Sequence, residues 1–211
     1  MFFKICGIKD KSTITCCEKN NVNFYGMIFY EKSPRNISIN KAILLINYSQ
    51  KLKIKPVGVF VNEKMSNIAN KITKLNLKFV QLHGDEDENY FNNLKKKFKI
   101  KIIKKISIQN QTDLKNLDRF KSADYYLFDY KPKRGELPGG NAKKFDWSIL
   151  SNININKPWF LSGGININNI NNIKKYVNPH GIDLSSGVEE SPGIKNIYMI
   201  NRIDTKSVKI I

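Results

Sequence analysis

The stretch that decides the fold runs from Trp159-Phe-Leu-Ser-Gly-Gly164 to Gly181-Ile-Asp-Leu-Ser-Ser-Gly187. Two short apolar runs, each ending in serine and glycine, are separated by a segment, Ile167–Val177, that is predicted to be helical. Neither run alternates strictly between apolar and polar residues, which is typical of strands in a parallel sheet that is covered on both faces. A strand, a helix and a second parallel strand form a βαβ unit, from which α/β folds are built.

The same unit recurs from one end of the chain to the other. Six further strands are predicted, at Phe3–Gly7, Phe24–Phe29, Pro56–Val61, Phe79–Leu82, Ile100–Ile106 and Tyr125–Phe128. The other predicted helices are Ser12–Lys19, Lys41–Lys51, Ser66–Leu75, Glu86–Phe98, Gln111–Phe120, Asp146–Ile149 and Ile197–Ile203. This succession predicts an α/β fold, a single-domain (β/α)8 TIM barrel that spans residues 1–211. A doubly wound open sheet uses the same alternation, but no G-x-G-x-x-G follows the first strand and no Walker sequence occurs.

The helix after the third strand shows its pattern most clearly. Ile68, Ile72 and Leu75 recur at spacings of four and three, so they form one apolar face. Ser66 or Asn67 is expected to cap the start of this helix, and Asn110 is expected to cap the fifth helix.

The composition explains the strong positive charge without a nucleic-acid partner. The 211 residues include 36 basic and 18 acidic ones, for a formal net charge of +18. Lysine, isoleucine and asparagine occur 32, 30 and 27 times, and their codons are rich in adenine and thymine, so genome bias is a sufficient cause. A basic RNA-binding protein would need clustered cations with exposed aromatics, but the dense run Lys95–Lys105 is interrupted by a strand.

Several other classes are disfavoured by the same inspection. No window of 18 apolar residues occurs, and Phe2–Ile8 is strand-like and lacks the cleavage region of a signal peptide. Cys6, Cys16 and Cys17 are odd in number and lack the paired spacing of a zinc site. We therefore expect a cytoplasmic protein with no membrane partner and no metal site.

Polar and glycine-rich residues follow six of the eight predicted strands. They include Cys6-Gly7, Lys32-Ser-Pro-Arg35, Gln81-Leu-His-Gly-Asp-Glu86 and Asp129, together with the two serine–glycine ends quoted above. Because reactive groups of a barrel come from the carboxyl ends of its strands, these residues are predicted to share one site.

The two serine–glycine ends are the best candidates for a phosphate site. The residues concerned are Gly163, Gly164, Ser185, Ser186 and Gly187. Glycines let backbone N–H groups approach an anion, and the loops after strands seven and eight are the usual phosphate site of barrels. The alternative is that these glycines only make tight turns that require positive φ.

Three further strand-end residues have both a chemical and a structural interpretation. Cys6 is either a small buried hydrophobe or, in electropositive surroundings such as Lys4, Lys9 or a bound substrate site, a reactive thiolate. Asp129 either caps the loop that follows it or is tuned for acid–base work. Arg35 is one of only four arginines in a lysine-rich chain, which suggests that this position needs the planar guanidinium, a group that can bind a carboxylate through two hydrogen bonds. The alternative is an ordinary exposed arginine. His83 and Gln81 carry no assigned role.

Taken in order, these segments resemble phosphoribosylanthranilate isomerase, a family of the tryptophan pathway. The matching segments are Lys4-Ile-Cys-Gly-Ile8, Phe29-Tyr-Glu-Lys-Ser-Pro-Arg35, Val57-Gly-Val-Phe-Val-Asn62, Val80-Gln-Leu-His-Gly-Asp-Glu86, Phe145-Asp-Trp147, Leu161-Ser-Gly-Gly-Ile165, Asp183-Leu-Ser-Ser-Gly-Val-Glu189 and Ser191-Pro-Gly-Ile-Lys195. They run in family order from residue 4 to residue 195, and together they are highly specific.

The resemblance implies a cofactor-free Amadori rearrangement of N-(5-phosphoribosyl)anthranilate by general acid and base catalysis. Cys6 matches the family's general base, Asp129 its general acid and Arg35 the arginine that holds the anthranilate carboxylate. The two serine–glycine ends match the phosphate-binding loops. The implied partner is a small phosphorylated substrate, and the chain is expected to act as a monomer or a homodimer.

One segment departs from the family pattern. The family commonly reads Gly-Gly-Thr-Gly-Lys-Thr before Phe-Asp-Trp, whereas this chain reads Gly139-Gly-Asn-Ala-Lys-Lys144. The related sugar-phosphate isomerase of the histidine pathway is the alternative among enzymes. That relative is expected to use two aspartates, so Cys6 at the end of the first strand argues against it.

Overall fold

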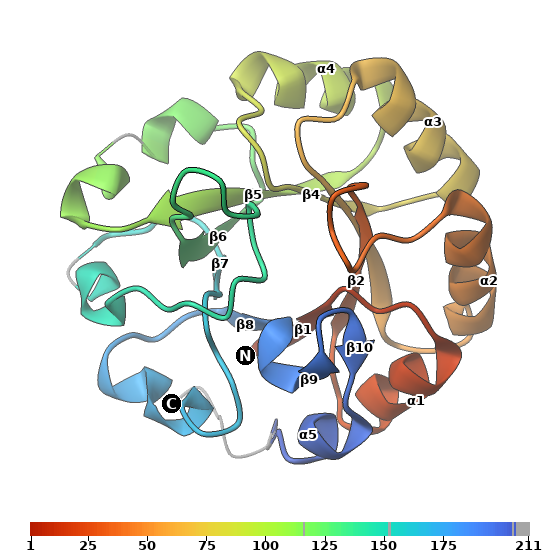
Figure 1. The fold of residues 1–211 in the computed structure, drawn as a ribbon. Coiled ribbons are helices and arrows are strands. Elements are labelled where there is room, and N and C mark those ends of the chain that lie inside the picture. Colours follow the sequence, from red (N-terminus) through yellow and green to blue (C-terminus); the bar gives the residue numbers. More distant parts are fainter. Residues whose placement is uncertain (116, 152, 204, 206–211) are drawn as a thin grey trace.

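Eight parallel strands close into a barrel in the computed structural model, which describes residues 1–115, 117–151, 153–203 and 205 (Figure 1). Each strand pairs with the next, and the last pairs with the first. In chain order they are β1 (Phe2–Cys6), β2 (Phe24–Phe29), β3 (Lys55–Phe60), β4 (Phe79–Leu82), β5 (Lys101–Ile108), β6 (Tyr125–Tyr130), β7 (Trp159–Leu161) and β8 (Gly181–Leu184). The predicted (β/α)8 barrel is confirmed. The predicted domain limits, 1–211, include positions that lie outside the described residues.

The helices of the first half of the chain agree with prediction to within about two residues, which is the usual uncertainty of a helix end. They are α1 (Lys11–Lys19), α2 (Ile39–Ser49), α3 (Met65–Leu75) and α4 (Glu88–Lys97). Asp10, Ser38 and Asp87 cap α1, α2 and α4 through their side chains. The predicted caps of α3 were wrong: its N-cap is Lys64, which makes no side-chain cap hydrogen bond.

The second half of the chain covers the barrel with short 3₁₀ turns, where α-helices were predicted. These are η1 (Gln111–Leu114), η2 (Leu117–Phe120), η3 (Trp147–Leu150) and η4 (Ile170–Lys175), followed by a short α-helix, α5 (Ile197–Asn201). Before η4, the side chain of Asn166 accepts from the backbone of Asn168, and that of Asn169 accepts from the backbone of Asn166. Such local bonds compete with helical ones, which explains the shortened helix. Asn110 does cap η1, in a reciprocal capping box with Asp113.

The barrel interior is apolar at one end and polar at the other. Every second strand residue points inward, and the apolar part contains Phe24, Val57, Val59, Ile103, Leu127 and Phe160. Phe24 contacts the rings of Phe2, Phe79 and Phe160 with centroids 5.1 to 6.1 Å apart, which closes the N-terminal end. Towards the carboxyl ends of the strands the inward residues become polar, among them Gln81, Lys105, Asp129 and Asp183. The polar side chains that could bind or react with a ligand therefore lie at the carboxyl end of the barrel.

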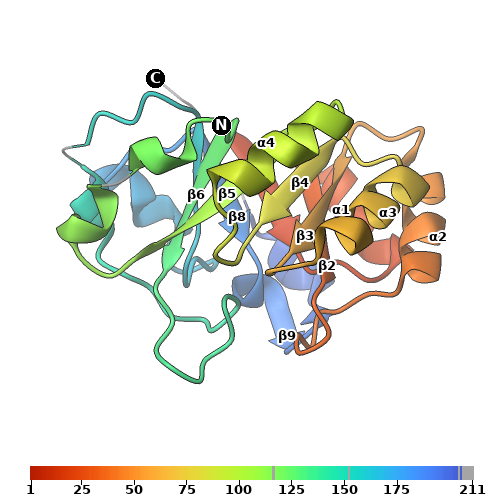
Figure 2. The same ribbon diagram turned by 90° about the horizontal axis from the view of Figure 1, so that it is seen from above.

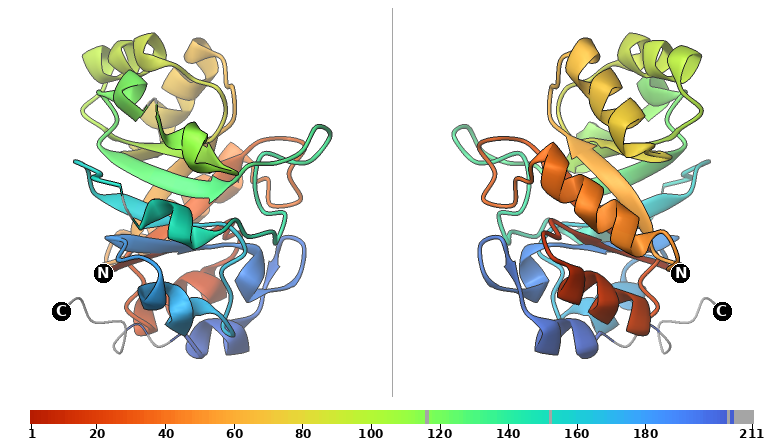
Figure 3. Two further views of the ribbon diagram at one scale, coloured as in Figure 1. Left: turned by 90° about the vertical axis from the view of Figure 1, so that its left-hand side faces the viewer. Right: turned by 90° about the vertical axis from the view of Figure 1, so that its right-hand side faces the viewer.

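The loop between β2 and α2 projects from that end of the barrel, opposite the N-terminus, and so do two further segments (Figures 2 and 3). One follows β6 and spans residues 131–146. The other is a hairpin that was not predicted, formed by β9 (Glu189–Ser191) and β10 (Ile194–Lys195), directly after the 3₁₀ turn η5 (Ser186–Val188). None of the described helices is long and apolar enough to cross a bilayer.

A buried ion pair anchors the loop after β4. Lys104 points outward from β5 and donates to Glu86 Oε2 (3.1 Å) and to the carbonyl oxygen of Gly84 (2.6 Å). Both side chains of the pair are 2% exposed. Glu86 also accepts from the backbone N–H groups of Asn62 and Gly84, so it fixes the segment that carries His83.

Replacing Lys104 with methionine should lower the free energy of unfolding by about 3–5 kcal/mol, because it leaves a buried carboxylate without its cation. Urea denaturation measures this value. Lys101→Met is the matched control on the same strand: its side chain is 59% exposed, so loss of its pair with Asp124 should change the free energy of unfolding far less. If both variants lower the free energy of unfolding by the same small amount, the Lys104–Glu86 pair does not anchor the loop after β4. Adding Glu86→Gln to Lys104→Met should recover much of the loss.

Candidate active site

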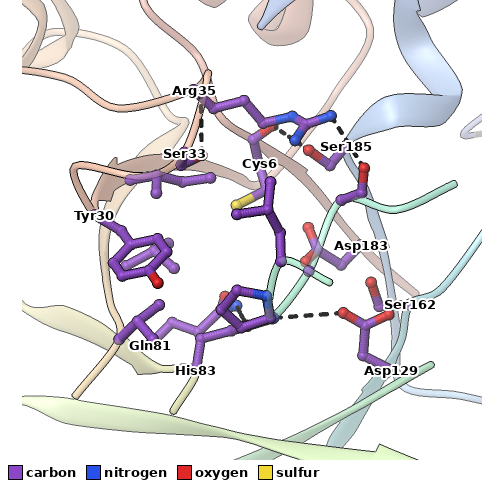
Figure 4. Close-up of a pocket in the computed structure, with 17 residues that line it drawn as sticks. Cys6, Tyr30, Ser33, Arg35, Gln81, His83, Asp129, Ser162, Asp183 and Ser185 are labelled. Carbon is purple, nitrogen blue, oxygen red and sulfur yellow. Dashed lines mark hydrogen bonds and ion pairs between the residues drawn. The ribbon is translucent and has the colours of Figure 1, made fainter. Parts of the chain in front are cut away.

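The predicted strand-end residues meet in one pocket at the polar end of the barrel (Figure 4). Cys6, Arg35 and Asp129 all line it, although they come from three separate segments of the chain. Gln81, His83 and Asp183 complete its polar wall, and Ile28, Val59 and Leu137 are among its apolar residues. The pocket lies at the carboxyl ends of the strands, where active sites of barrels of this kind are found.

Cys6 is the last residue of β1, and its sulfur faces the pocket. The side chain is buried next to β2, where a Cβ on Gly26 would lie 2.7 Å from the sulfur, so only glycine leaves room for it there. Lys4, two residues earlier on the same inward face, is fully buried and donates to both carboxylate oxygens of Asp183 at 3.0 Å. Burial raises the pKa of the Cys6 thiol, and the Lys4 ammonium acts against this rise.

Asp129 lies within β6 rather than at its end, because the strand continues to Tyr130. Its Oδ1 accepts from the backbone N–H of Tyr130 (2.8 Å), and its Oδ2 lies 3.5 Å from Nε2 of His83. Gln81 Nε2 donates to Nδ1 of His83 (2.8 Å), which leaves the ring proton on Nε2, facing Asp129. Burial lowers the pKa of His83, so its ring is neutral at neutral pH. Gln81 Oε1 is buried without a hydrogen-bond partner among the described residues, and both Gln81 and His83 line the pocket.

Arg35 is held by a protein carboxylate along one edge of its guanidinium. Its Nε and Nη2 donate to the two oxygens of Glu189 at 2.8 and 2.6 Å. Glu189 also accepts from Lys195 Nζ (2.7 Å), and all three side chains are buried. The second edge of the guanidinium faces the loop after β6, where Nη2 donates to the carbonyl oxygen of Gly140 (3.3 Å). Arg35 is therefore not exposed, and a ligand can reach only the Nη1–Nη2 edge.

The predicted phosphate residues converge beside this pocket. Gly163, Gly164, Ser185 and Ser186 line an adjoining cavity together with Lys143, whose ammonium is paired with Glu136. Gly163 and Gly164 have φ of +87° and +65°. The alternative explanation, that these glycines make turns requiring positive φ, therefore also applies to them. Gly187 does not line the cavity but brings the two loops together, since a Cβ there would lie 1.9 Å from the carbonyl oxygen of Ile165.

The loop after β6 covers both cavities. A Cβ on Gly139 would lie 2.5 Å from His83 Nε2, and one on Gly140 would lie 2.3 Å from Arg35 Nη1. Ala142 has φ +56°, at the position where the family pattern has glycine. That conformation costs a non-glycine residue roughly 1–2 kcal/mol. Ala142 therefore adopts the backbone conformation that glycine would have at this position, and this lowers the stability of the loop.

Sequence reasoning missed three charged residues of the site: Asp183, Glu189 and Lys195. Lys4 was considered only as a cation near Cys6, and its pair with Asp183 was not predicted, although both are charges within otherwise apolar strands. Glu189 and Lys195 belong to the unpredicted hairpin, and nothing in their spacing points to Arg35. No cluster of three or more histidine, cysteine or acidic side chains suited to a metal occurs in the part of the chain that the structure describes.

Comparisons with known proteins agree with one another. The model of a family described as N-(5'-phosphoribosyl)anthranilate (PRA) isomerase matches residues 3–205. The N-(5'-phosphoribosyl)anthranilate isomerase of Rhizobium etli (strain CIAT 652) is 38% identical over 200 residues, which cover 94% of this chain and 90% of that protein. The crystal structure of phosphoribosyl anthranilate isomerase from Thermotoga maritima superposes with a TM-score of 0.87 at 29% identity, covering 98% of this chain and 99% of that one. A further phosphoribosyl anthranilate isomerase structure is a complex with reduced 1-(o-carboxyphenylamino)-1-deoxyribulose 5-phosphate; its TM-score is 0.80 at 28% identity, and 98% of each chain is covered.

Proposed function

This chain belongs to the N-(5'-phosphoribosyl)anthranilate isomerase family, and we propose that it catalyses the family's step in tryptophan biosynthesis. The reaction is the Amadori rearrangement of N-(5-phosphoribosyl)anthranilate to 1-(2-carboxyphenylamino)-1-deoxyribulose 5-phosphate. The observation that carries the proposal is the convergence of Cys6, Asp129 and Arg35 in one pocket, beside a glycine-lined cavity.

The two ends of the substrate match the two cavities. The phosphate fits the cavity of Gly163, Gly164, Ser185 and Ser186, where backbone N–H groups of glycine-rich loops favour an anion. The anthranilate carboxylate fits the Nη1–Nη2 edge of Arg35, where it would replace the weak contact with the Gly140 carbonyl. Because Glu189 holds the opposite edge of Arg35, the guanidinium is already oriented for this contact.

The first chemical step opens the ribose ring. Asp129 donates a proton to the ring oxygen, the bond from that oxygen to C1 breaks, and the nitrogen lone pair forms a Schiff base at C1. The Asp129 side chain is 6% exposed and lines the pocket, where it can reach the ring oxygen of a bound substrate. His83 limits the orientation of the carboxyl group from its other side.

The second step moves hydrogen from C2 to C1. The Schiff base acidifies the C2 proton, Cys6 accepts it, and the resulting enolamine becomes the ketone when C1 is protonated. C2 is oxidised and C1 is reduced within one molecule, so the balance needs no external electron carrier. An acid and a base on different strands can serve opposite sides of one small substrate.

Two experiments test the proposal. Purified protein should convert N-(5-phosphoribosyl)anthranilate to the ketose product, as separated by chromatography. The gene should also restore growth of a bacterial strain that lacks this isomerase, whereas the Cys6→Ser/Asp129→Asn variant should not. A folded, well-expressed protein that does neither would refute the proposed function.

A further inference from the structure

Two buried ammonium groups converge on Cys6 from outside the substrate pocket. Lys4 is fully buried and the side chain of Lys195 is 1% exposed. Neither residue lines the catalytic pocket or the phosphate cavity, so neither is placed to hold the substrate. Lysine is rarely buried this deeply, and two such side chains beside one sulfur need a physical explanation.

Lys4 approaches Cys6 from beneath. Inward-facing residues on a strand are two apart, so the Lys4 side chain occupies the layer below the sulfur. Lys4 is directly opposite Asp183 in the β1–β8 pairing, and its ammonium contacts both oxygens of that carboxylate. Asp183 fixes the position of the cation, and Lys4 in turn interacts favourably with a Cys6 thiolate.

Lys195 approaches from the β9–β10 hairpin. Its Nζ donates to the carbonyl oxygen of Ser185 (3.0 Å) and to Glu189. The Ser185 hydroxyl donates in turn to the carbonyl oxygen of Cys6 (3.2 Å), so the hairpin is tied directly to the end of β1. Lys195 also interacts favourably with a Cys6 thiolate, while burial lowers the pKa of Lys195 itself.

Stability alone does not explain these pairs, because buried ion pairs are often no better for folding than apolar side chains of the same size. We propose that Lys4 and Lys195 are positioning residues that favour the thiolate of Cys6, the form that accepts the substrate's C2 proton. This inference rests on the proposed role of Cys6 as the base. It adds to that role the groups through which an otherwise inert, buried thiol becomes basic.

Three charged groups act on the sulfur. Lys4 on β1 and Lys195 on β10 favour the thiolate, whereas Asp183 on β8 disfavours it. Burial raises the pKa of Cys6 most strongly, and the two lysines offset part of that rise without reversing it. Removing either cation should therefore raise the pKa of Cys6 further.

The test is a titration of Cys6 in the intact protein. Iodoacetamide labelling is measured against pH, and mass spectrometry separates Cys6 from Cys16 and Cys17 because trypsin places them in different peptides. Lys195→Met should move the Cys6 midpoint upwards by about one pH unit, and kcat/KM at neutral pH should fall about tenfold through loss of thiolate. This variant is expected to fold because Glu189 keeps its contact with Arg35.

Lys105→Met is the matched control, since Lys105 is an inward-facing lysine of β5 that is 6% exposed and interacts with Asp129 rather than with Cys6. Its Cys6 midpoint should equal that of the wild type. Lys4→Met/Asp183→Asn removes the other pair without leaving a buried charge. Asp183 opposes Lys4 at the sulfur but acts on it less strongly, so the Cys6 midpoint of this double variant should still rise. Unchanged midpoints in both Lys195→Met and this double variant would overturn the inference. The titration does not depend on turnover, so an inactive wild type would refute the proposed function while leaving the midpoints to decide the role of the lysines.

Discussion

Replacing Asp129 with asparagine should lower kcat by about a thousandfold, the middle of the range for loss of a general acid. Asparagine keeps the size of the side chain, and its amide oxygen can still accept from the Tyr130 N–H as Oδ1 does now. It cannot donate a proton of comparable acidity to the ring oxygen, so the substrate should bind but remain closed. Steady-state kinetics should therefore show the loss in kcat with little change in KM.

Asp118→Asn is the control for this experiment, because Asp118 is an exposed carboxylate that does not line the pocket. Its kcat should match that of the wild type. If Asp129→Asn instead keeps turnover within a few-fold of the wild type, ring opening does not depend on this carboxyl group, and the acid must be sought elsewhere in the pocket. His83 would be the first residue to examine, given its position beside Asp129.

The strands could be predicted from the sequence because both of their faces are buried. The ends of β2, β4, β7 and β8 were placed to the residue, since continuous apolar runs bounded by polar residues leave little choice of limits. The helices of the second half could not be placed as well. The asparagines around Ile170–Lys175 retain the apolar spacing of a helix while bonding to their own backbone, and periodicity does not register that competition.

The sequence predicted which strand-end residues share the candidate site, but not the ion pairs within it. Because parallel strands of a barrel end on one face, Cys6 and Asp129 could be placed together without knowing any contact. Glu189 and Arg35 are 154 positions apart, and Lys4 and Asp183 are 179 apart. Ion pairs between residues so far apart in the sequence form only when the barrel closes and the β9–β10 hairpin folds, so no local sequence pattern predicts them. The orientation of Arg35 towards Glu189 could therefore not be predicted.

Replacing Cys6 with serine should also lower kcat by about a thousandfold, which corresponds to roughly 4 kcal/mol in the barrier. A serine hydroxyl fits beside Gly26 at least as well as the sulfur does, so the fold should be preserved. Its oxygen is too weak an acid to be ionised at neutral pH, even with Lys4 and Lys195 nearby, and the C2 proton then has no acceptor. The measurement is steady-state turnover, with thermal unfolding as the check on the fold.

The pH dependence separates loss of the base from general damage to the site. Burial raises the pKa of Cys6, so the fraction of thiolate, and with it kcat/KM, should increase with rising pH up to that pKa. Cys6→Asp restores a base that ionises at lower pH, so its rising limb should shift towards acid and its activity should exceed that of Cys6→Ser at neutral pH. A rising limb at the same pH in the wild type and in Cys6→Asp would assign that titration to a group other than residue 6. Because Asp129 is unchanged in both proteins, the shift of this one limb identifies the base directly.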